Sequence, residues 1–293
     1  KNLINVRILG HLLSYGPSDV AIAEVARTIV SAENRDAHDG GGLAELGGYY
    51  NKFLLRIFRR FKGQTPQGSD DHSRPSKCAT QEEVRAILEA SPQNHTEAKT
   101  AALARDGYRC IVTGKLDQPH YEATAVTGLG VDQQLPIGGA PGICYTECAH
   151  IFPESINWEI GDNSQESDNN KHAAEALSII KSFGYEEVAK ALQSSGVHSL
   201  QNVLTLPYDI HRNFNSLSLW FERTSASSNT YRVVATLPLW LLSAPEEVTF
   251  ESHVPGATVP NPRYLHLHAS CCKVAHVSGA SSYYDELERQ LEE

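Results

Sequence analysis

The chain has 293 residues, of which 41% are hydrophobic and 20% charged, and its formal net charge at pH 7 is -10. This composition is typical of a globular protein with a hydrophobic core, and the length allows one large domain or two of ordinary size. No segment approaches the roughly 20 consecutive apolar residues of a membrane-spanning helix, so we expect no contact with a membrane. The acidic charge disfavours nucleic acid as a partner, because phosphates are bound by a basic face.

Residues 1–29 carry charged side chains throughout and contain no uninterrupted apolar stretch, which is not typical of a signal peptide. Six cysteines are too few for a disulfide scaffold in a chain of this length. We therefore expect an intracellular protein, and the sequence does not distinguish the nucleus from the cytoplasm.

The first third of the chain is predicted to be mainly helical. The apolar run 5–13 fits a strand or a buried helix equally well, and a capped helix is predicted from Ser18 to about Ala32. The glycine-rich stretch 40–48 is expected to interrupt the helical pattern. Apolar residues then recur at helical spacing over 49–61, with arginines and lysines between them. These cations either contact an anionic ligand or, as we favour, extend from a core helix into solvent.

A polar loop rich in glycine, proline and serine is predicted over 63–77. Thr80 and Glu83 have the spacing of a capping box, so a helix is predicted to begin there and to stop near Pro92. A second helix is predicted over 96–105.

Beyond residue 107, short strands alternate with helices. Strands are predicted over 108–113, 143–152 and 202–206, and a β-hairpin over 217–235. Helices are predicted over 172–192, 208–215, 264–277 and 282–291.

Three short segments contain the residue types of a hydrolytic metal site. They are Glu147-Cys-Ala-His150-Ile, Asn202-Val-Leu-Thr-Leu and Ile210-His211-Arg-Asn-Phe-Asn215. Positions i and i+4 share one helix face, so His211 and Asn215 can point at one ion. Imidazole titrates near neutral pH, so His150 on a neighbouring strand can face that ion as a general base.

The order of these segments resembles the HNH nuclease superfamily, in particular the HNH-domain proteins of fungi. The matching pieces are Arg109-Cys-Ile-Val-Thr-Gly114, Glu147-Cys-Ala-His-Ile-Phe-Pro153, Asn202-Val-Leu-Thr-Leu-Pro-Tyr-Asp-Ile-His211 and Leu219-Trp-Phe-Glu222, with further likeness at 265–269 and 278–280. The resemblance implies a ββα-metal fold, in which a β-hairpin and a helix enclose a divalent ion.

The resemblance also implies a role for each motif residue. His150 is the expected general base, Asn202 braces the loop or orients this base, and His211, assisted by Asn215, binds Mg²⁺ or another divalent ion. Active members usually carry Asp or His where this chain has Ala149, and many carry Asp or His at position 215. An imidazole and a neutral amide are poor ligands for a hard cation, so we expect a depleted metal site. Nearby carboxylates that could supply charge are Glu147, Glu154 and Asp209.

The predicted fold class is α+β, with an HNH ββα-metal core embedded in a mostly helical protein. We expect a mainly helical N-terminal region at 1–78 and an HNH-like module with flanking helices at 79–240. A helical tail at 241–293 is expected to pack on this core.

Three functions are compatible with these features. The first is an HNH endonuclease, a metal-binding hydrolase of nucleic acid, and the order of His150, Asn202 and His211 favours it. The second is a fungal enzyme of secondary metabolism, a cyclase or isomerase that acts on a small molecule without a metal, which suits the acidic charge and the aromatic residues. The third is a pseudonuclease that binds without catalysis, since a fold does not fix a function.

Overall fold

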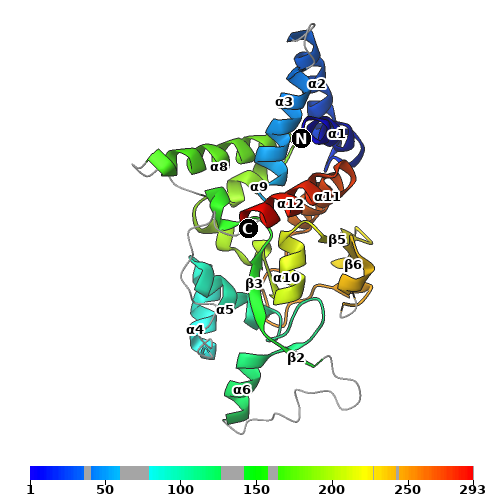
Figure 1. The fold of residues 1–293 in the computed structure, drawn as a ribbon. Coiled ribbons are helices and arrows are strands. Elements are labelled where there is room, and N and C mark those ends of the chain that lie inside the picture. Colours follow the sequence, from blue (N-terminus) through cyan, green and yellow to red (C-terminus); the bar gives the residue numbers. More distant parts are fainter. Residues whose placement is uncertain are drawn as a thin grey trace.

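The structure is a computed structural model that describes residues 1–35, 41–59, 79–126, 142–157, 164–226, 228–241 and 244–292. Helices surround small sheets of two or three strands, which confirms the predicted α+β class (Figure 1). In these ranges no helix has the length and apolar character that crossing a membrane requires.

The N-terminal region consists of α1 (Asn2–Tyr15), α2 (Asp19–Arg35), α3 (Gly41–Tyr50) and the π-helical turn η1 (Asn51–Leu55). The ambiguous apolar run near the N-terminus is therefore a helix, and α1 turns Ile8, Leu9 and Leu12 into the core. The predicted start of α2 is confirmed, because the Ser18 hydroxyl accepts a hydrogen bond from the backbone N–H of Ala21 at 3.0 Å.

Gly40 lies outside the described residues, and the prediction that the following glycines up to position 48 interrupt a helix is wrong, because α3 runs through them. A Cβ atom at Gly47 would lie 2.0 Å from the carbonyl oxygen of Asn5, so only glycine lets α1 and α3 approach this closely. Asn5 also donates a hydrogen bond to the carbonyl of Ala44 at 3.1 Å. Close packing between the two helices therefore offsets the low helix propensity of glycine, about 1 kcal/mol per residue.

The next helices are α4 (Gln81–Ala90) and α5 (His95–Arg105), and the predicted capping box of Thr80 and Glu83 is present at the start of α4. The strand predicted over 108–113 is absent from its place in the described chain. The Cys110 sulfur accepts the backbone N–H groups of Val112 and Thr113 at 3.3 and 3.2 Å, which curls this segment into a turn. Strand propensity takes no account of these hydrogen bonds between the cysteine sulfur and the backbone.

The hairpin region begins with β1 (Leu116–Asp117), which pairs parallel with β2 (Ile143–Cys144). The strands predicted near 143–152 and 202–206 and the helix predicted over 208–215 are present, whereas the helix predicted over 172–192 is divided into α8 and α9. The elements are α6 (Gln118–Val126), β2 (Ile143–Cys144), β3 (Thr146–His150), η3 (Glu154–Asn157), α8 (Ser164–Ser182), α9 (Glu186–Ala191), η4 (Ser194–His198), η5 (Leu200–Asn202), β4 (Val203–Pro207) and α10 (Tyr208–Asn215). Strands β3 and β4 pair antiparallel, with His150 opposite Val203 and Glu147 opposite Leu206.

The C-terminal part contains β5 (Leu219–Arg223), β6 (Thr230–Ala235), η6 (Pro238–Leu241) and β7 (Glu247–Thr249), followed by α11 (Pro262–Ser278) and α12 (Ala280–Glu292). The predicted hairpin of β5 and β6 is confirmed, and β7 extends it to three strands. Helix α11 is buried on most sides and contacts both α1 and β5.

The hydrophobic core joins these parts. Its largest cluster contains residues of α1, η1, β3, α10, β5 and α11. A second, smaller cluster lies between α5 and the β3–β4 hairpin. The hairpin is thus covered on both sides, by α5 on one and by α10 on the other (Figure 1).

Candidate functional site

The β3–β4 hairpin presents its side chains in two directions, because neighbouring residues of a strand point to opposite faces. Ala149 packs in the large core cluster with α10, whereas Cys148 packs against the alanines of α5. Glu147 therefore shares the face of Ala149, and His150 shares the face of Cys148. We name these two sides the α10 face and the α5 face of the hairpin.

The α5 face is closely packed because α5 presents small side chains to it. Ala98, Ala101 and Ala102 are fully buried against Cys148 and Val203 of the hairpin. This close contact brings His95, the first residue of α5, beside the end of β3. The side chain of Asn94 caps α5 by accepting the backbone N–H of Glu97, which fixes where the helix begins.

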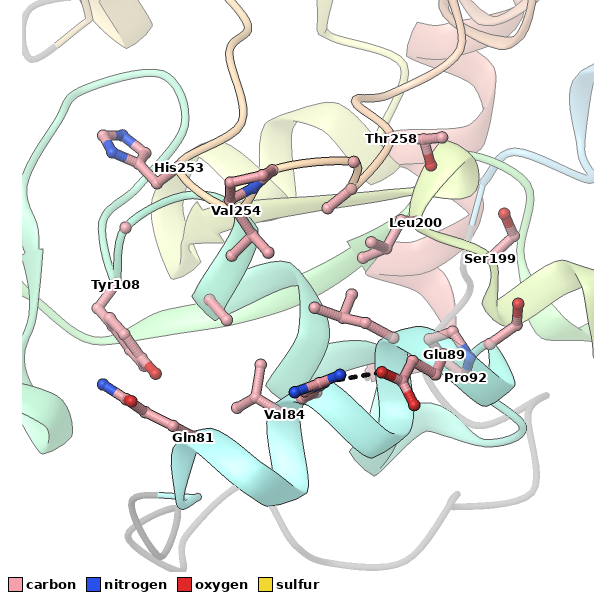
Figure 2. A pocket seen from close by; sticks show the side chains of 18 of the residues that line it. Gln81, Val84, Glu89, Pro92, Tyr108, Ser199, Leu200, His253, Val254 and Thr258 are labelled. Atoms are coloured by element: carbon pink, nitrogen blue, oxygen red, sulfur yellow. Dashed lines mark hydrogen bonds and ion pairs between the residues drawn. The ribbon is translucent and has the colours of Figure 1, made fainter.

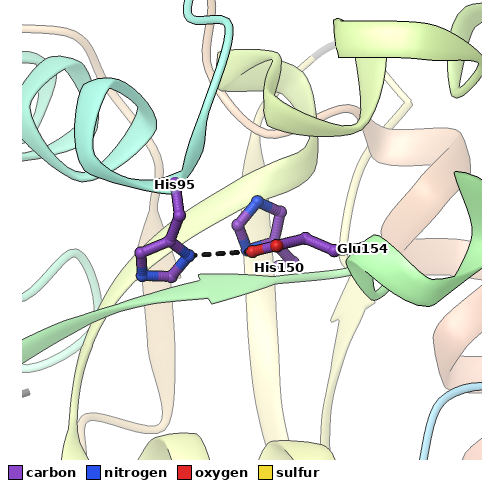
Figure 3. Close-up of side chains that lie close together, drawn as sticks. All are labelled: His95, His150 and Glu154. Carbon is purple, nitrogen blue, oxygen red and sulfur yellow. Dashed lines mark hydrogen bonds and ion pairs between the residues drawn. The ribbon is translucent and has the colours of Figure 1, made fainter. Parts of the chain in front are cut away.

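Three imidazoles and one carboxylate meet on the α5 face, and we name His95, His150, Glu154 and His198 the His150 cluster. His95 Nδ1 lies 2.9 Å from Glu154 Oε1, and His150 Nδ1 lies 3.8 Å from the same oxygen. On its other side, His150 Nε2 lies 3.3 Å from His198 Nδ1. Figure 3 shows the Glu154 carboxylate next to His150, with a dashed line joining it to His95.

Exposure differs within the His150 cluster. The side chain of His150 is 0% exposed, whereas those of His95 and Glu154 are 37% and 40% exposed. A small ligand can therefore reach the Glu154 carboxylate from solvent, whereas the side chain of His150 is enclosed by protein.

Electrostatic interactions keep Glu154 ionised. Its hydrogen bond with His95 is the largest influence and lowers the pKa of the carboxyl to about 2, against the opposing effect of burial. Burial is also the main reason why the pKa of His198 lies below its usual value of 6.5. The cluster therefore combines an anionic oxygen with a neutral imidazole at neutral pH.

Asn202 is fully buried and connects the segments that carry His150 and His198. Its side-chain oxygen accepts the backbone N–H of Phe152 at 2.9 Å, two residues after His150. Its side-chain nitrogen donates to the carbonyls of Phe152 at 2.9 Å and Val197 at 2.8 Å. The amide thus has three hydrogen bonds to backbone groups, and none of them leads to a substrate. Asn202 is a brace for the geometry of the cluster.

The α10 face carries a second polar chain, formed by Glu147, His211 and Asn215. Glu147 Oε2 lies 2.6 Å from His211 Nδ1, and Asn215 Nδ2 lies 2.9 Å from His211 Nε2. A carboxylate at Nδ1 favours the tautomer with the proton on that nitrogen, which leaves a lone pair on Nε2. His211 and Asn215 lie one helical turn apart on α10, within hydrogen-bonding distance of each other.

The structure does not bring His150 and His211 together. Glu147 and His150 are three positions apart on one strand, so their side chains leave the hairpin on opposite faces. The expectation that His150 faces the ion held by His211 therefore does not match the geometry. The carboxylate nearest His211 is Glu147, and the one nearest His150 is Glu154.

Sequence reasoning did not single out His95 and His198 as site residues. His95 lies 59 positions from Glu154 in sequence, and His198 lies 48 positions from His150, so no local spacing links them. Glu147 and His150 are three positions apart in a segment predicted to be a strand. Side chains an odd number of positions apart in a strand point to opposite faces, so the sequence already indicates that these two diverge.

The side chains of the His150 cluster carry the types of donor atom that bind metal ions. The ligand atoms of His95, His150 and Glu154 all lie within 4.8 Å of one another. Two imidazole nitrogens and one carboxylate oxygen are the ligand set of many catalytic zinc sites and suit other first-row transition metals. Among the residues that the structure describes, no other group of three such side chains meets this distance.

A separate cavity of about 1090 Å³ lies between α4, α5 and the segment 253–258. Figure 2 shows Tyr108 and His253 at one end and Pro92 with Ser199 at the other. None of the residues of the His150 cluster lines it. The cavity therefore does not provide a small-molecule site at these imidazoles.

One comparison with known proteins identifies a family. The sequence model of the HNH endonuclease family matches residues 110–222, which include the hairpin, α10 and most of β5. No curated protein and no solved structure matches the chain. The matched range contains His150, Asn202 and His211, and it leaves out α4 and α5. Residues 110–222 of this chain are therefore a domain of the HNH nuclease superfamily.

Proposed function

We propose that this HNH domain hydrolyses phosphodiester bonds of nucleic acid at the His150 cluster. The observation that carries the proposal is the pair of imidazoles formed by His150 and His198, 3.3 Å apart. The buried amide of Asn202 holds the backbone near each of them, at Phe152 and at Val197. Hydrolysis needs a base that is unprotonated near neutral pH and fixed in position, and a braced imidazole pair meets both needs.

In the proposed reaction the imidazole pair accepts the proton of the attacking water. His150 is inaccessible from outside, so His198, which is half-buried, is the member nearer to a bound substrate. Asn202 does not touch the substrate and acts as a positioning residue. A bound divalent ion supplies Lewis-acid stabilisation of the charge that develops on the phosphate oxygens.

His211 and Asn215 stay in the proposal as a second pair of ion ligands, on the α10 face. Glu147 orients His211 through Nδ1, as carboxylates often do behind a metal-bound imidazole. The two direct ligands are neutral, however, so an ion here would depend on phosphate oxygens of the substrate for charge. The donor set of the His150 cluster is the stronger of the two.

The net charge of -10 limits how nucleic acid is held. Non-specific affinity for a duplex grows with the number of phosphates that cationic side chains neutralise. We therefore expect weak binding and turnover that is fastest at low salt.

The test is nicking of supercoiled plasmid at low salt with Mg²⁺ or Mn²⁺. We expect His150→Gln and His198→Ala to lower the nicking rate by about 10²–10⁴-fold, the usual contribution of a general base. The exposed His276 is the matched control, and His276→Ala should nick at the wild-type rate. Circular dichroism of each variant checks that it is folded.

Three outcomes contradict the proposal. Folded His150→Gln and His198→Ala proteins that nick at the wild-type rate would remove the His150 cluster from catalysis, and loss of nicking in His211→Ala alone would move it to the α10 face. Absence of nicking by the wild-type protein with either ion would leave the non-catalytic pseudonuclease as the better hypothesis.

A further inference from the structure

We propose that His95, His150 and Glu154 bind a first-row transition-metal ion of the zinc class, and that this ion fastens α5 to the hairpin. The inference goes beyond the proposed function, because it depends on donor geometry and not on any reaction. It also extends past the matched family range of 110–222, since His95 lies outside it.

The three donor atoms lie within 4.8 Å of one another. Glu154 Oε1 lies 2.9 Å from His95 Nδ1 and 3.8 Å from His150 Nδ1. Ligands of a tetrahedral zinc ion at bond lengths near 2.0 Å lie about 3.3 Å from one another. Small rotations of His95 and Glu154 suffice to reach this spacing, and both side chains have solvent on one side.

The identity of the donors selects the class of ion. Two nitrogens and one oxygen suit Zn²⁺ and its neighbours Mn²⁺, Co²⁺ and Ni²⁺, whereas Mg²⁺ prefers a shell of oxygens. Three protein ligands with partial solvent exposure leave at least one position open, as in zinc sites that bind water or substrate. We therefore expect Zn²⁺ to bind far more tightly than Mg²⁺.

His198 completes the second layer of this site. With the ion on His150 Nδ1, the proton of this ring lies on Nε2 and is donated to His198 Nδ1, 3.3 Å away. Zinc bound here therefore occupies the imidazole pair that acts as the base in the proposed reaction. Histidines that bind metals usually have such a partner on the other ring nitrogen, which fixes the tautomer and the ring orientation.

The packing of α5 explains why this arrangement is formed before any ion arrives. Ala98, Ala101 and Ala102 let the helix approach the hairpin, and Arg105 at its other end donates to the carbonyls of Leu200 and Val203. The middle and the C-terminal end of the helix are therefore held against the hairpin, which places its first residue, His95, beside Glu154.

The experiment uses the full chain without an affinity tag, stripped of metal with a chelator and then titrated with ZnCl₂ in a calorimeter. We expect one Zn²⁺ per chain, a rise in the unfolding temperature with ZnCl₂, and no such rise with MgCl₂. His95→Ala and Glu154→Gln should each weaken Zn²⁺ binding by at least about tenfold. The matched controls His276→Ala and Glu187→Gln, both at exposed positions, should bind like the wild type.

Diffraction at the zinc absorption edge locates the ion. An anomalous peak between His95, His150 and Glu154 supports the site. A peak at His211 or at the cysteines, equal binding by His95→Ala and wild type, or no binding of ZnCl₂ overturns it. These readouts do not use nicking, so a bound ion without nicking would refute only the proposed reaction, and nicking without zinc at this place would refute only the site.

Discussion

At the scale of single residues, Asn202 shows how one buried amide can determine the geometry of a site that it does not enter. Its three hydrogen bonds end on the backbone of Phe152 and Val197. These residues lie beside Ile151 and His198, so the amide sets the distance between two loops. The sequence motif predicted a bracing role for Asn202, and only the structure reveals what it braces.

We expect Asn202→Ala to lower the free energy of unfolding by roughly 3 kcal/mol. The change leaves the N–H of Phe152 and the carbonyl of Val197 buried without their partner, and each such group costs about 1–3 kcal/mol. Urea denaturation monitored by tryptophan fluorescence measures the change. Asn2→Ala, at an exposed position of α1, is the control and should leave the midpoint unchanged. An equally small effect of both substitutions would show that Asn202 is not a brace.

The motif residues differ in how far the sequence predicts their surroundings. The pairing of His211 with Asn215 follows from helix periodicity alone, because both lie on α10. The partners of His150 come from α5 and η4, far away in the chain. Nothing in the residues around His150 indicates which helix will cover it, so His95 and His198 could not be found from sequence.

At the scale of elements, the position of α5 determines which side chains meet His150 on the β3–β4 hairpin. Arg105 at the end of this helix is 0% exposed, with two hydrogen bonds to Asp106 and one each to the carbonyls of Leu200 and Val203. The helix is thereby tied to the segment where β4 begins. The sequence predicted the helix and its approximate ends but not its position against the hairpin.

We expect Arg105→Lys to destabilise the protein by about 2–4 kcal/mol, because at least two buried acceptors lose their donor and each such group costs roughly 1–3 kcal/mol. A lysine cannot make two parallel bonds to Asp106 while it also reaches both carbonyls. Urea denaturation and hydrogen exchange of α5 measure the effect. Arg85→Lys is the matched control, because Arg85 is exposed and pairs only with Glu89 one turn away in α4, so its midpoint should not move. If both variants unfold at the same urea concentration, Arg105 does not hold α5.

Helix α3 is an element whose local sequence predicts the wrong structure. Propensity predicts a break at its glycines, and the structure has a continuous helix because Gly47 lets α1 pass at close range. Packing against another element therefore overrode the local preference.

At the scale of the whole molecule, the two ends of the chain and the HNH domain share one core. Arg59 is 1% exposed and lies where three parts meet. Its guanidinium donates to Asp285 and Glu288 of α12 and to the carbonyl of Ser216 after α10. The sequence indicated a cation that extends from a core helix into solvent. This expectation is wrong for Arg59, which is buried, and Tyr284 of α12 packs in the core.

We expect the double variant Asp285→Asn with Glu288→Gln to lower the free energy of unfolding by about 2 kcal/mol. It leaves the buried Arg59 guanidinium without both of its carboxylate partners, and the value allows for the partial exposure of these carboxylates. Urea denaturation at low and high salt measures it. Glu286→Gln, an exposed neighbour on the same helix, is the control. A double variant as stable as the control would mean that α12 is not held by Arg59.

The sequence by itself determined most of the helices, the strands β3, β4, β5 and β6, and the motif residues His150, Asn202 and His211. These features depend on contacts between near neighbours, for which periodicity and capping are sufficient guides. Tertiary structure alone decided that α5 covers the face of His150 and supplies His95. That choice follows from the fit of small side chains across the hairpin, an interaction between segments that no local pattern encodes.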